Sequence, residues 1–118
     1  MSYDIRLHDA ETGVTTKLDE KHKWQGGTYQ VGGSELAKFN VTYNYGAILH
    51  NVLPPQGIRT LYGLTGNESM PLLRKAIAEL GDETSKDYWD ATEGNVKVAL
   101  IAMLNLACMC PDSVWDGD

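Results

Sequence analysis

The sequence predicts an α+β fold, in which a small antiparallel sheet from the N-terminal half packs on a C-terminal helical half with a buried last helix. Two observations support this prediction. Apolar and polar residues alternate in residues 1–45, as in strands, whereas from residue 45 onward apolar residues recur every three or four positions, as in helices. A length of 118 residues corresponds to one domain, so we expect residues 1–118 to form a single globular domain.

The first two predicted strands are residues 3–7 and 14–18. In both, apolar side chains alternate with polar ones, as expected where one face of a strand is buried. The segment between them, DAETG at 9–13, is typical of a turn. The two strands are therefore expected to pair as a hairpin.

The next predicted segment is a charged loop over residues 19–27, which ends in two glycines. A short strand is predicted over 28–31. Gly32-Gly33-Ser34 then reads as a turn, because glycine adopts positive φ without steric cost. Residues 37–43 alternate again and form the last predicted strand, with Tyr43 on its apolar face.

A helix is predicted over residues 45–53. Its apolar stripe has the spacing i, i+3, i+4, i+7, i+8 and consists of Tyr45, Ile48, Leu49, Val52 and Leu53. Asn44 is placed to cap this helix, and Pro54-Pro55 ends it. Residues 56–66 form an irregular or partly extended connector.

The second predicted helix carries the stripe Leu73, Ala76, Ile77 and Leu80. Asn67 or Ser69 can cap it, with Pro71 in its first turn. Gly81 is the expected residue just beyond its C-terminal end.

The last helix is predicted over residues 93–109, with Thr92 as its cap and Pro111 beyond its end. Between residues 96 and 109 only Lys97 and Asn105 are polar. A helix that is apolar on nearly every side is normally central and buried.

Two acidic segments flank this helix. The segment 82–91 is expected to contain a helical turn, with Tyr88 and Trp89 packed inward. The segment after Pro111, DSVWDGD, is acidic with a single aromatic residue.

The charge balance narrows the classes of partner. The chain has 16 Asp and Glu residues, 10 Lys and Arg residues and a net charge of -6. A protein that binds nucleic-acid phosphates or an anionic membrane surface needs a basic face, so we expect neither direct nucleic-acid binding nor membrane binding. Acidic proteins do bind basic surfaces of other proteins, and the alternative is that the charge serves only solubility.

The sequence also predicts a cytoplasmic location. The first residues lack the apolar core of a signal peptide, and the run 98–104 is too short to span a bilayer. Cys108 and Cys110 are the only cysteines, and two residues apart at a helix end they cannot easily bridge each other. We expect them to be reduced thiols.

Five motifs occur in order along the chain: GGTYQVGG, NVTYNYG, GIRTLYGLTG, DYWDATEGN and PDSVWDGD. Together they resemble a family of small proteins associated with bacteriophages and prophages of gut and Gram-positive bacteria. The resemblance covers nearly the whole chain. It implies a phage origin, hence the cytoplasm of a bacterial host, and a size class, but no activity. Compact acidic phage proteins are often accessory factors that bind a host protein, and this association is the basis for expecting such a role here. The resemblance implies no catalytic residue, cofactor or substrate.

The sequence predicts neither a metal site nor a catalytic site, and no cofactor. The three histidines are far apart, and Cys108-x-Cys110 has no second ligand pair nearby. An apolar helix end raises the pKa of a thiol and lowers its reactivity. The neighbouring carboxylates Asp82 with Glu83, and Asp87 with Asp90, are interpreted as a solvated acidic face.

One constellation remains as a candidate binding site. Tyr, Trp and Arg dominate interface hot spots because they combine a large contact area with a polar group. Packing and helix capping are the alternative explanation for several members. The candidate residues are Asn40, Tyr43, Asn44, Arg59, Tyr62, Trp89 and Trp115, with Trp24 as a second aromatic in a polar stretch.

The resulting functional prediction is a non-enzymatic binding protein that acts on a host or phage protein, for example as an inhibitor of a bacterial defence system. The alternative is a small-ligand or nucleotide-binding protein, in which Asn40, Tyr43, Arg59, Tyr62 and Trp89 line a pocket. That alternative requires Arg59 to lie close to Asn40 and Tyr43. A carboxylate-dependent hydrolase or transferase ranks third. The sequence does not predict the oligomeric state.

Overall fold

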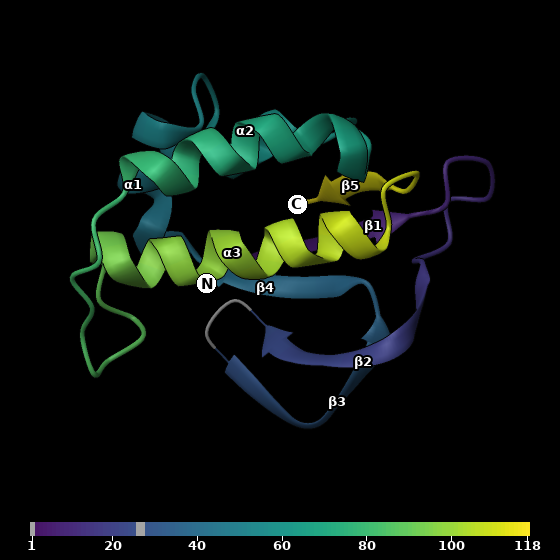
Figure 1. Ribbon diagram of the computed structural model, residues 1–118, viewed down its shortest axis with the longest axis horizontal. Helices are drawn as coiled ribbons and strands as arrows, with labels where there is room; N and C mark the ends of the chain where they lie inside the picture. The colour runs from purple at the N-terminus through teal and green to yellow at the C-terminus, as the bar shows by residue number, and fades with distance from the viewer. Residues whose placement is uncertain (1, 26–27) are drawn as a thin grey trace.

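A computed structural model describes residues 2–25 and 28–118, and the side chains of residues 22–33 lie outside the described part. Two helices cover one face of an antiparallel sheet with the strand order β4-β1-β5 (Figure 1). The sheet strands are β1 (Ser2–His8), β4 (Lys38–Thr42) and β5 (Val114–Gly117). The covering helices are α2 (Gly66–Glu79) and α3 (Glu93–Met109). The predicted α+β class is confirmed.

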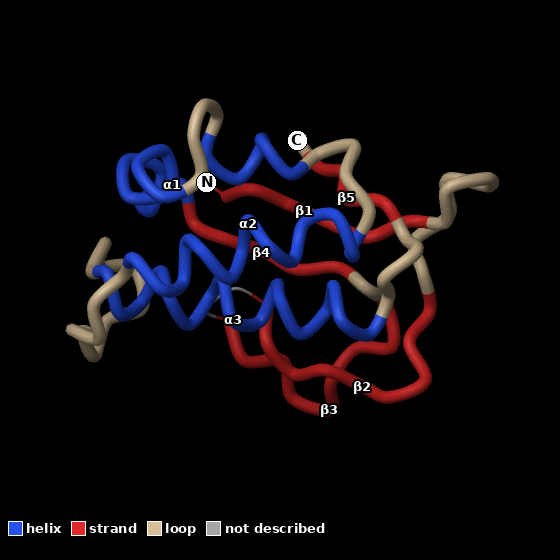
Figure 2. Tube along the Cα trace, turned by 45° about the horizontal axis from the view of Figure 1, so that its top comes forward, coloured by secondary structure: helices blue, strands red, loops and turns tan. Residues whose placement is uncertain are grey.

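Five further elements complete this architecture. Strands β2 (Lys17–Gln25) and β3 (Thr28–Leu36) pair with each other in a separate antiparallel sheet. The short 3₁₀ helix η1 (Tyr43–Tyr45) leads into α1 (Gly46–Val52), and a second 3₁₀ helix, η2 (Gly57–Leu61), follows. Helix α1 and the segment 80–92 lie at the same end of the molecule (Figures 1 and 2).

Strand β1 forms the centre of the main sheet. Its alternate residues Tyr3, Ile5 and Leu7 are buried, as the alternation predicted. The predicted hairpin with residues 14–18 is wrong in extent, because only His8 and Thr15 form a bridge there. Instead β1 pairs with β4 on one side and with β5 on the other. These distant partners supply buried faces that match Tyr3, Ile5 and Leu7, whereas the chain after Thr16 leaves β1 to pair with β3.

Two sequence predictions in the β2–β3 sheet are wrong. Strand β2 occupies most of the predicted loop 19–27, and β3 passes through the predicted turn at 32–34. Among residues 17–21 only Leu18 is buried, so this solvated strand carries no alternation that a pattern could reveal. The glycines of β3 are compatible with extended backbone, although they weaken a strand. The predicted glycine pair at 26–27 lies outside the described residues.

The first helix has nearly the predicted bounds, but its cap differs. The hydroxyl of Thr42 accepts a hydrogen bond from the Asn44 backbone N–H at 3.2 Å and so caps η1. Helix α1 continues from η1 without a side-chain cap. The prediction that Asn44 caps the helix is therefore wrong.

Helix α2 begins earlier than predicted. Its cap is Thr65, whose hydroxyl accepts from the Glu68 N–H at 3.1 Å, while the Glu68 carboxylate accepts from the Thr65 N–H at 3.0 Å. This reciprocal pair is a capping box. The predicted caps Asn67 and Ser69 lie inside the helix, and Pro71 lies beyond its first turn.

Helix α3 has the predicted bounds and the predicted cap, since Thr92 Oγ1 accepts from the Asn95 N–H at 3.1 Å. Seven of its residues are buried: Gly94, Val96, Ala99, Leu100, Met103, Leu106 and Ala107. Its opposite face is partly exposed at Val98, Ile101 and Met109. The helix is therefore central to the core on one face and reaches solvent on the other.

The acidic segment before α3 contains one hydrogen-bonded turn, as expected: the Asp90 N–H donates to the Asp87 main-chain oxygen at 3.1 Å, and the turn does not extend into a helix. Its Tyr88 is half-buried and packs against the core, as expected. Trp89, which was expected to pack inward, is 55% exposed. The structure therefore places a large aromatic side chain on the surface of an acidic loop.

Candidate functional site

The predicted binding residues fall into three places. Asn40, Tyr43, Arg59 and Tyr62 belong to a cluster at the edge where β1, β4 and β5 meet η2, which we call the sheet-end cluster. Asn44 and Trp89 lie together at the acidic loop 80–92. Trp115 lies in the core.

Asn40 is held by the neighbouring strand. Its Nδ2 donates to Ser2 Oγ and to Asp4 Oδ1, both at 2.6 Å. These two bonds use both N–H groups of the amide. Asn40 thus joins β4 to β1 across the outward face of the sheet.

Arg59 reaches the end of β5. Its Nε donates to the main-chain oxygen of Asp118 at 2.9 Å, and its guanidinium lies 5.1 Å from the centre of the Tyr3 ring. The Tyr3 ring in turn meets the Tyr43 ring edge-on, with centroids 4.5 Å apart. The Arg59 and Tyr43 side chains are therefore connected through Tyr3.

Tyr62 and Gly117 complete the sheet-end cluster. The Tyr62 hydroxyl donates to the Asp118 oxygen at 3.4 Å, and burial together with the nearby Asp118 raises the pKa of Tyr62. A Cβ on Gly117 would lie 2.5 Å from the Tyr62 hydroxyl and 2.6 Å from the Asp4 oxygen. The packing at this position therefore requires glycine.

Asn40 and Arg59 do not bond each other directly; Asp4 and Asp118 connect them. The Asp4 N–H donates to Asp118 Oδ1 at 3.0 Å, so Asp4 contacts the Asn40 amide and Asp118 contacts Arg59. Three hollows that the described residues line lie elsewhere. The contacts of the sheet-end cluster fasten β5 to the rest of the sheet.

The loop group positions Trp89. The Asn44 side chain donates to the Trp89 main-chain oxygen at 3.1 Å, and the Trp89 N–H donates to Asp87 Oδ1 at 3.0 Å. The Tyr45 hydroxyl donates to the main-chain oxygen of Tyr88, and burial raises the pKa of Tyr45. These bonds fix the backbone of the loop while the indole ring stays largely in solvent.

Trp115 is not a surface residue, contrary to its selection as a binding residue. Its side chain is 1% exposed, and its Nε1 donates to Ser69 Oγ at 2.8 Å in the core. Strand β5 carries it between the sheet and α2, so packing in the core explains this residue. The side chain of Trp24 lies outside the described part of the chain.

Two adjoining hollows lie between α1, the end of α2 and the start of α3. They have volumes of about 380 and 240 Å³ and share Ile48 and Glu93. Val52 and Leu80 add apolar surface, and Glu79, Asp82 and Glu83 add carboxylates. We call this combined feature the acidic groove.

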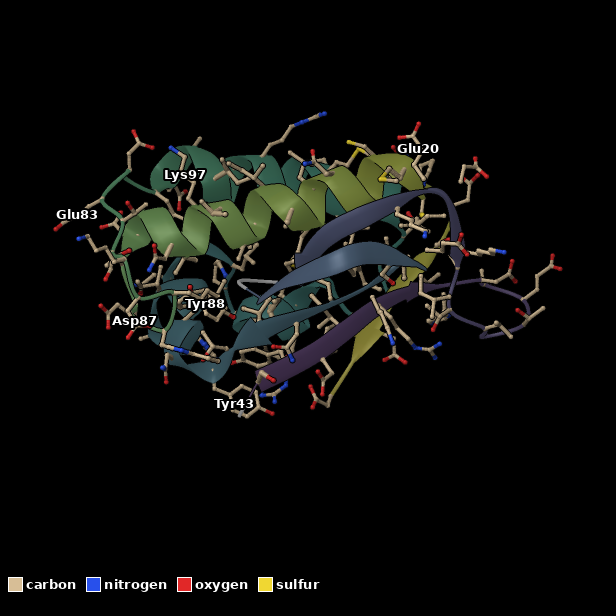
Figure 3. All side chains as sticks on the ribbon, turned by 90° about the horizontal axis from the view of Figure 1, so that it is seen from below. Glu20, Tyr43, Glu83, Asp87, Tyr88 and Lys97 are labelled. Atoms are coloured by element: carbon tan, nitrogen blue, oxygen red, sulfur yellow. The ribbon has the colours of Figure 1, made fainter. Side chains whose placement is uncertain are left out.

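Two hydrogen bonds shape the edge of the acidic groove. Lys97 Nζ donates to Asp82 Oδ1 at 2.8 Å, and this bond and the lysine charge lower the pKa of the Asp82 carboxyl. The Gly81 N–H donates to Glu93 Oε1 at 3.0 Å. Figure 3 shows Glu83, Asp87 and Lys97 at one end of the molecule and Glu20 at the other.

Only part of this groove is predictable from the sequence. The sequence pattern places Asp82 and Glu83 on a solvated acidic face and does not indicate that they line a hollow. Ile48 and Val52 were assigned to the buried stripe of α1, yet both are only half-buried. Their remaining exposure depends on how α1 meets α2 and α3, which periodicity alone does not reveal.

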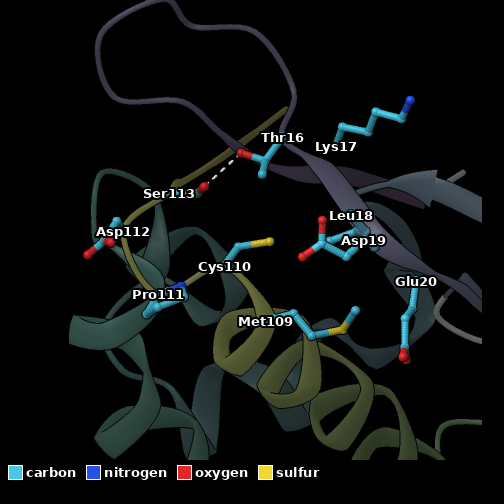
Figure 4. Close-up of a pocket in the computed structure, with 10 residues that line it drawn as sticks. All are labelled: Thr16, Lys17, Leu18, Asp19, Glu20, Met109, Cys110, Pro111, Asp112 and Ser113. Atoms are coloured by element: carbon cyan, nitrogen blue, oxygen red, sulfur yellow. Dashed lines mark hydrogen bonds between the residues drawn. The ribbon is translucent and has the colours of Figure 1, made fainter.

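A larger hollow, of about 480 Å³, lies between the start of β2 and the end of α3. Figure 4 shows Cys110 with its sulfur directed toward β2, where Asp19 lies. Burial, with a smaller contribution from Asp19, raises the pKa of the Cys110 thiol, as predicted for this helix end. A thiol with a raised pKa is a poor nucleophile at neutral pH.

Within residues 2–25 and 28–118, no group of three or more His, Cys, Asp or Glu residues is placed to hold a metal ion. In the same ranges, no helix combines the length and the apolar character needed to cross a bilayer. No protein-family model matches this chain, and comparisons with curated proteins and with solved structures found no match either.

Proposed function

We propose that this chain is a small acidic protein that acts without catalysis, by binding a basic or mixed surface of another protein. The observation that carries the proposal is the end of the molecule formed by α1 and the segment 80–92. Exposed carboxylates and an indole ring that is 55% exposed lie close together there. Acidic surfaces attract and orient basic partners, and tryptophan is among the residues that most often dominate a protein interface.

The way in which Trp89 is held supports the proposal. Asn44 and Asp87 bind the main chain on either side of the indole, so the ring is presented by an ordered loop. A side chain that is already positioned loses less conformational entropy on binding than a mobile one.

The resemblance to phage and prophage proteins suggests where the protein acts. We infer a phage-encoded protein that acts in the cytoplasm of a bacterial host, where its cysteines stay reduced. Its partner is a host or phage protein. Inhibition of a bacterial defence system is one concrete form of this function.

The test compares the wild-type chain with Trp89→Ala and with Val14→Ala, which removes an exposed apolar side chain from the distant turn 9–14. Each tagged protein is incubated with host lysate at about 0.1 M salt, where charges interact over about 10 Å. The retained protein is then purified, and its dissociation constant is measured for all three chains.

We expect Trp89→Ala to weaken binding at least about tenfold and Val14→Ala to leave it unchanged. Failure to retain any protein above background would remove the support for the proposal. A purified partner that binds wild type and Trp89→Ala equally would show that the acidic end is not the binding surface.

A further inference from the structure

We propose that the acidic groove is a docking site for one segment of the partner protein, which carries an apolar anchor side chain flanked by lysine or arginine. This inference rests on the proposed protein-binding function and names the chemistry that the partner must present. The groove adjoins the loop that carries Trp89, so both features lie at one end of the molecule.

The apolar part of the groove fits a single anchor side chain. Ile48 and Val52 of α1 are half-buried, and Leu80 closes the end of α2 beside them. The hollow that these three residues line with Asn51, Glu79 and Glu93 has a volume of about 240 Å³. A cavity of about 150 Å³ already holds a benzene molecule, so a leucine or phenylalanine side chain is of the right size.

The carboxylates at the rim of the groove determine which charge the partner segment must carry beside its anchor residue. The carboxylates of Glu79, Asp82, Glu83 and Glu93 line the two hollows together with the apolar residues, and none of the described lining residues is basic. The nearest cation, Lys97, is bound to Asp82 and to the Leu80 main-chain oxygen. The groove therefore keeps a negative balance, which attracts lysine and arginine and repels phosphate groups.

The carboxylates are also spread in a way that suits a segment of chain. Glu79 belongs to the hollow on the α1 side, Asp82 and Glu83 belong to the hollow on the loop side, and Glu93 is shared. Cations on both sides of an anchor residue thus find carboxylates on both sides of the apolar surface. A single small cation would leave the apolar surface uncovered.

The experiment uses short synthetic peptides as probes. The first has a central phenylalanine flanked by lysines, the second replaces the phenylalanine with serine, and the third replaces the lysines with glutamates. Binding to the full chain is measured by calorimetry, and the contacted residues are mapped by NMR shifts. We expect the first peptide to bind at least tenfold more tightly than either of the others, with shifts at Ile48, Leu80 and Glu83.

Two variants test the groove in the protein. The pair Glu79→Gln and Glu83→Gln removes two rim charges, and its matched control is the pair Glu11→Gln and Glu20→Gln, which lies away from the groove. Ala91→Phe fills the groove from an exposed lining position. We expect the rim pair to weaken binding of the phenylalanine peptide at least fivefold and Ala91→Phe to weaken it at least tenfold. The control pair should change this affinity less than twofold. Thermal unfolding verifies that each variant is folded.

The outcomes separate this inference from the proposed function. A partner that binds the rim pair and Ala91→Phe as tightly as wild type would overturn the proposal that the groove is the docking site, but would leave the proposed protein-binding function intact. Equal binding of the phenylalanine and serine peptides would show that only charge is recognised, which also contradicts the groove. The absence of any partner, in the lysate or among the peptides, would overturn both proposals.

Discussion

At the scale of single residues, Trp115 shows how a side chain in an acidic, polar stretch becomes part of the core. The nearby Asp112, Asp116 and Asp118 are typical of a solvated segment, and no local pattern marks the indole as buried. The decisive contacts are with Leu7 in the sheet register and with Ser69 on α2, both far away in sequence. A prediction from sequence cannot supply partners of this kind, because they depend on the completed fold.

Replacing Trp115 with phenylalanine should destabilise the protein. The change removes the indole N–H that bonds Ser69 and leaves a small cavity, at a cost of about 2–4 kcal/mol in the free energy of unfolding. Urea unfolding followed by circular dichroism measures the loss. Trp89→Phe is the matched control and should change stability by less than about 0.5 kcal/mol, because this ring is largely exposed. Equal losses in the two variants would contradict the assignment of Trp115 to the core.

Replacing Gly117 with alanine should also destabilise the protein, by about 1–3 kcal/mol, because the new methyl group would meet the Asp4 main-chain oxygen at 2.6 Å. Gly81→Ala is the control, since its nearest neighbour is a flexible Glu93 oxygen at 3.8 Å. Thermal unfolding compares the two. A neutral Gly117→Ala would mean that β5 can shift away from the Tyr62 hydroxyl without loss.

At the scale of elements, the helices were more predictable than the strands. Thr92 and the apolar content of 93–109 defined α3 because cap and periodicity are both local signals. Strands β2 and β3 were missed or shortened because a mostly solvated strand and a pair of glycines look like loop and turn. Strand β5 has only four residues, and its pairing with β1 joins segments more than one hundred residues apart.

The capping box of α2 makes a pH-dependent contribution to stability. The hydrogen bonds with Thr65 lower the pKa of Glu68, so the folded chain binds fewer protons at this group than the unfolded chain. The contribution is therefore present above the unfolded pKa of about 4.3 and is lost as the pH falls through the lower, folded value.

We expect Glu68→Gln to be less stable than wild type at neutral pH, and the difference to vanish in acid below the folded pKa. Urea unfolding at a series of pH values measures it. Glu11→Gln is the control, because Glu11 lies in an exposed turn. A stability difference that is independent of pH would show that the carboxylate does not bond the Thr65 N–H.

At the scale of the whole molecule, the net charge was predictable from the sequence, but the positions of the carboxylates on the surface were not. The value of -6 directs attention to basic partners, yet it does not say where the carboxylates gather. The acidic groove exists because α1, Leu80 and the start of α3 meet around half-buried Ile48 and Val52. Whether Asn40 lies near Arg59 was left open by the sequence; the structure connects Asn40, Arg59 and Tyr62 through Asp4 and Asp118, and these contacts fasten β5.

Association with a basic partner should depend on salt mainly through the association rate. Raising the salt concentration from about 0.05 to 0.5 M shortens the distance over which the carboxylates of the acidic end attract a partner. It should therefore slow association, with a smaller effect on dissociation. Surface plasmon resonance on the purified pair measures both rates. An association rate that does not change with salt would contradict electrostatic attraction by the acidic end.

The pairing of β1 with β5 also sets an order of events during synthesis on the ribosome. Residues 2–8 are made before α3, whereas the strand that covers one of their edges is made after α3 is complete. Until residues 114–117 emerge, β1 has an unpaired edge, and the site that Trp115 fills beside Ser69 stays empty. Unpaired edges invite aggregation, so this part of the nascent chain stays vulnerable until β5 leaves the exit tunnel.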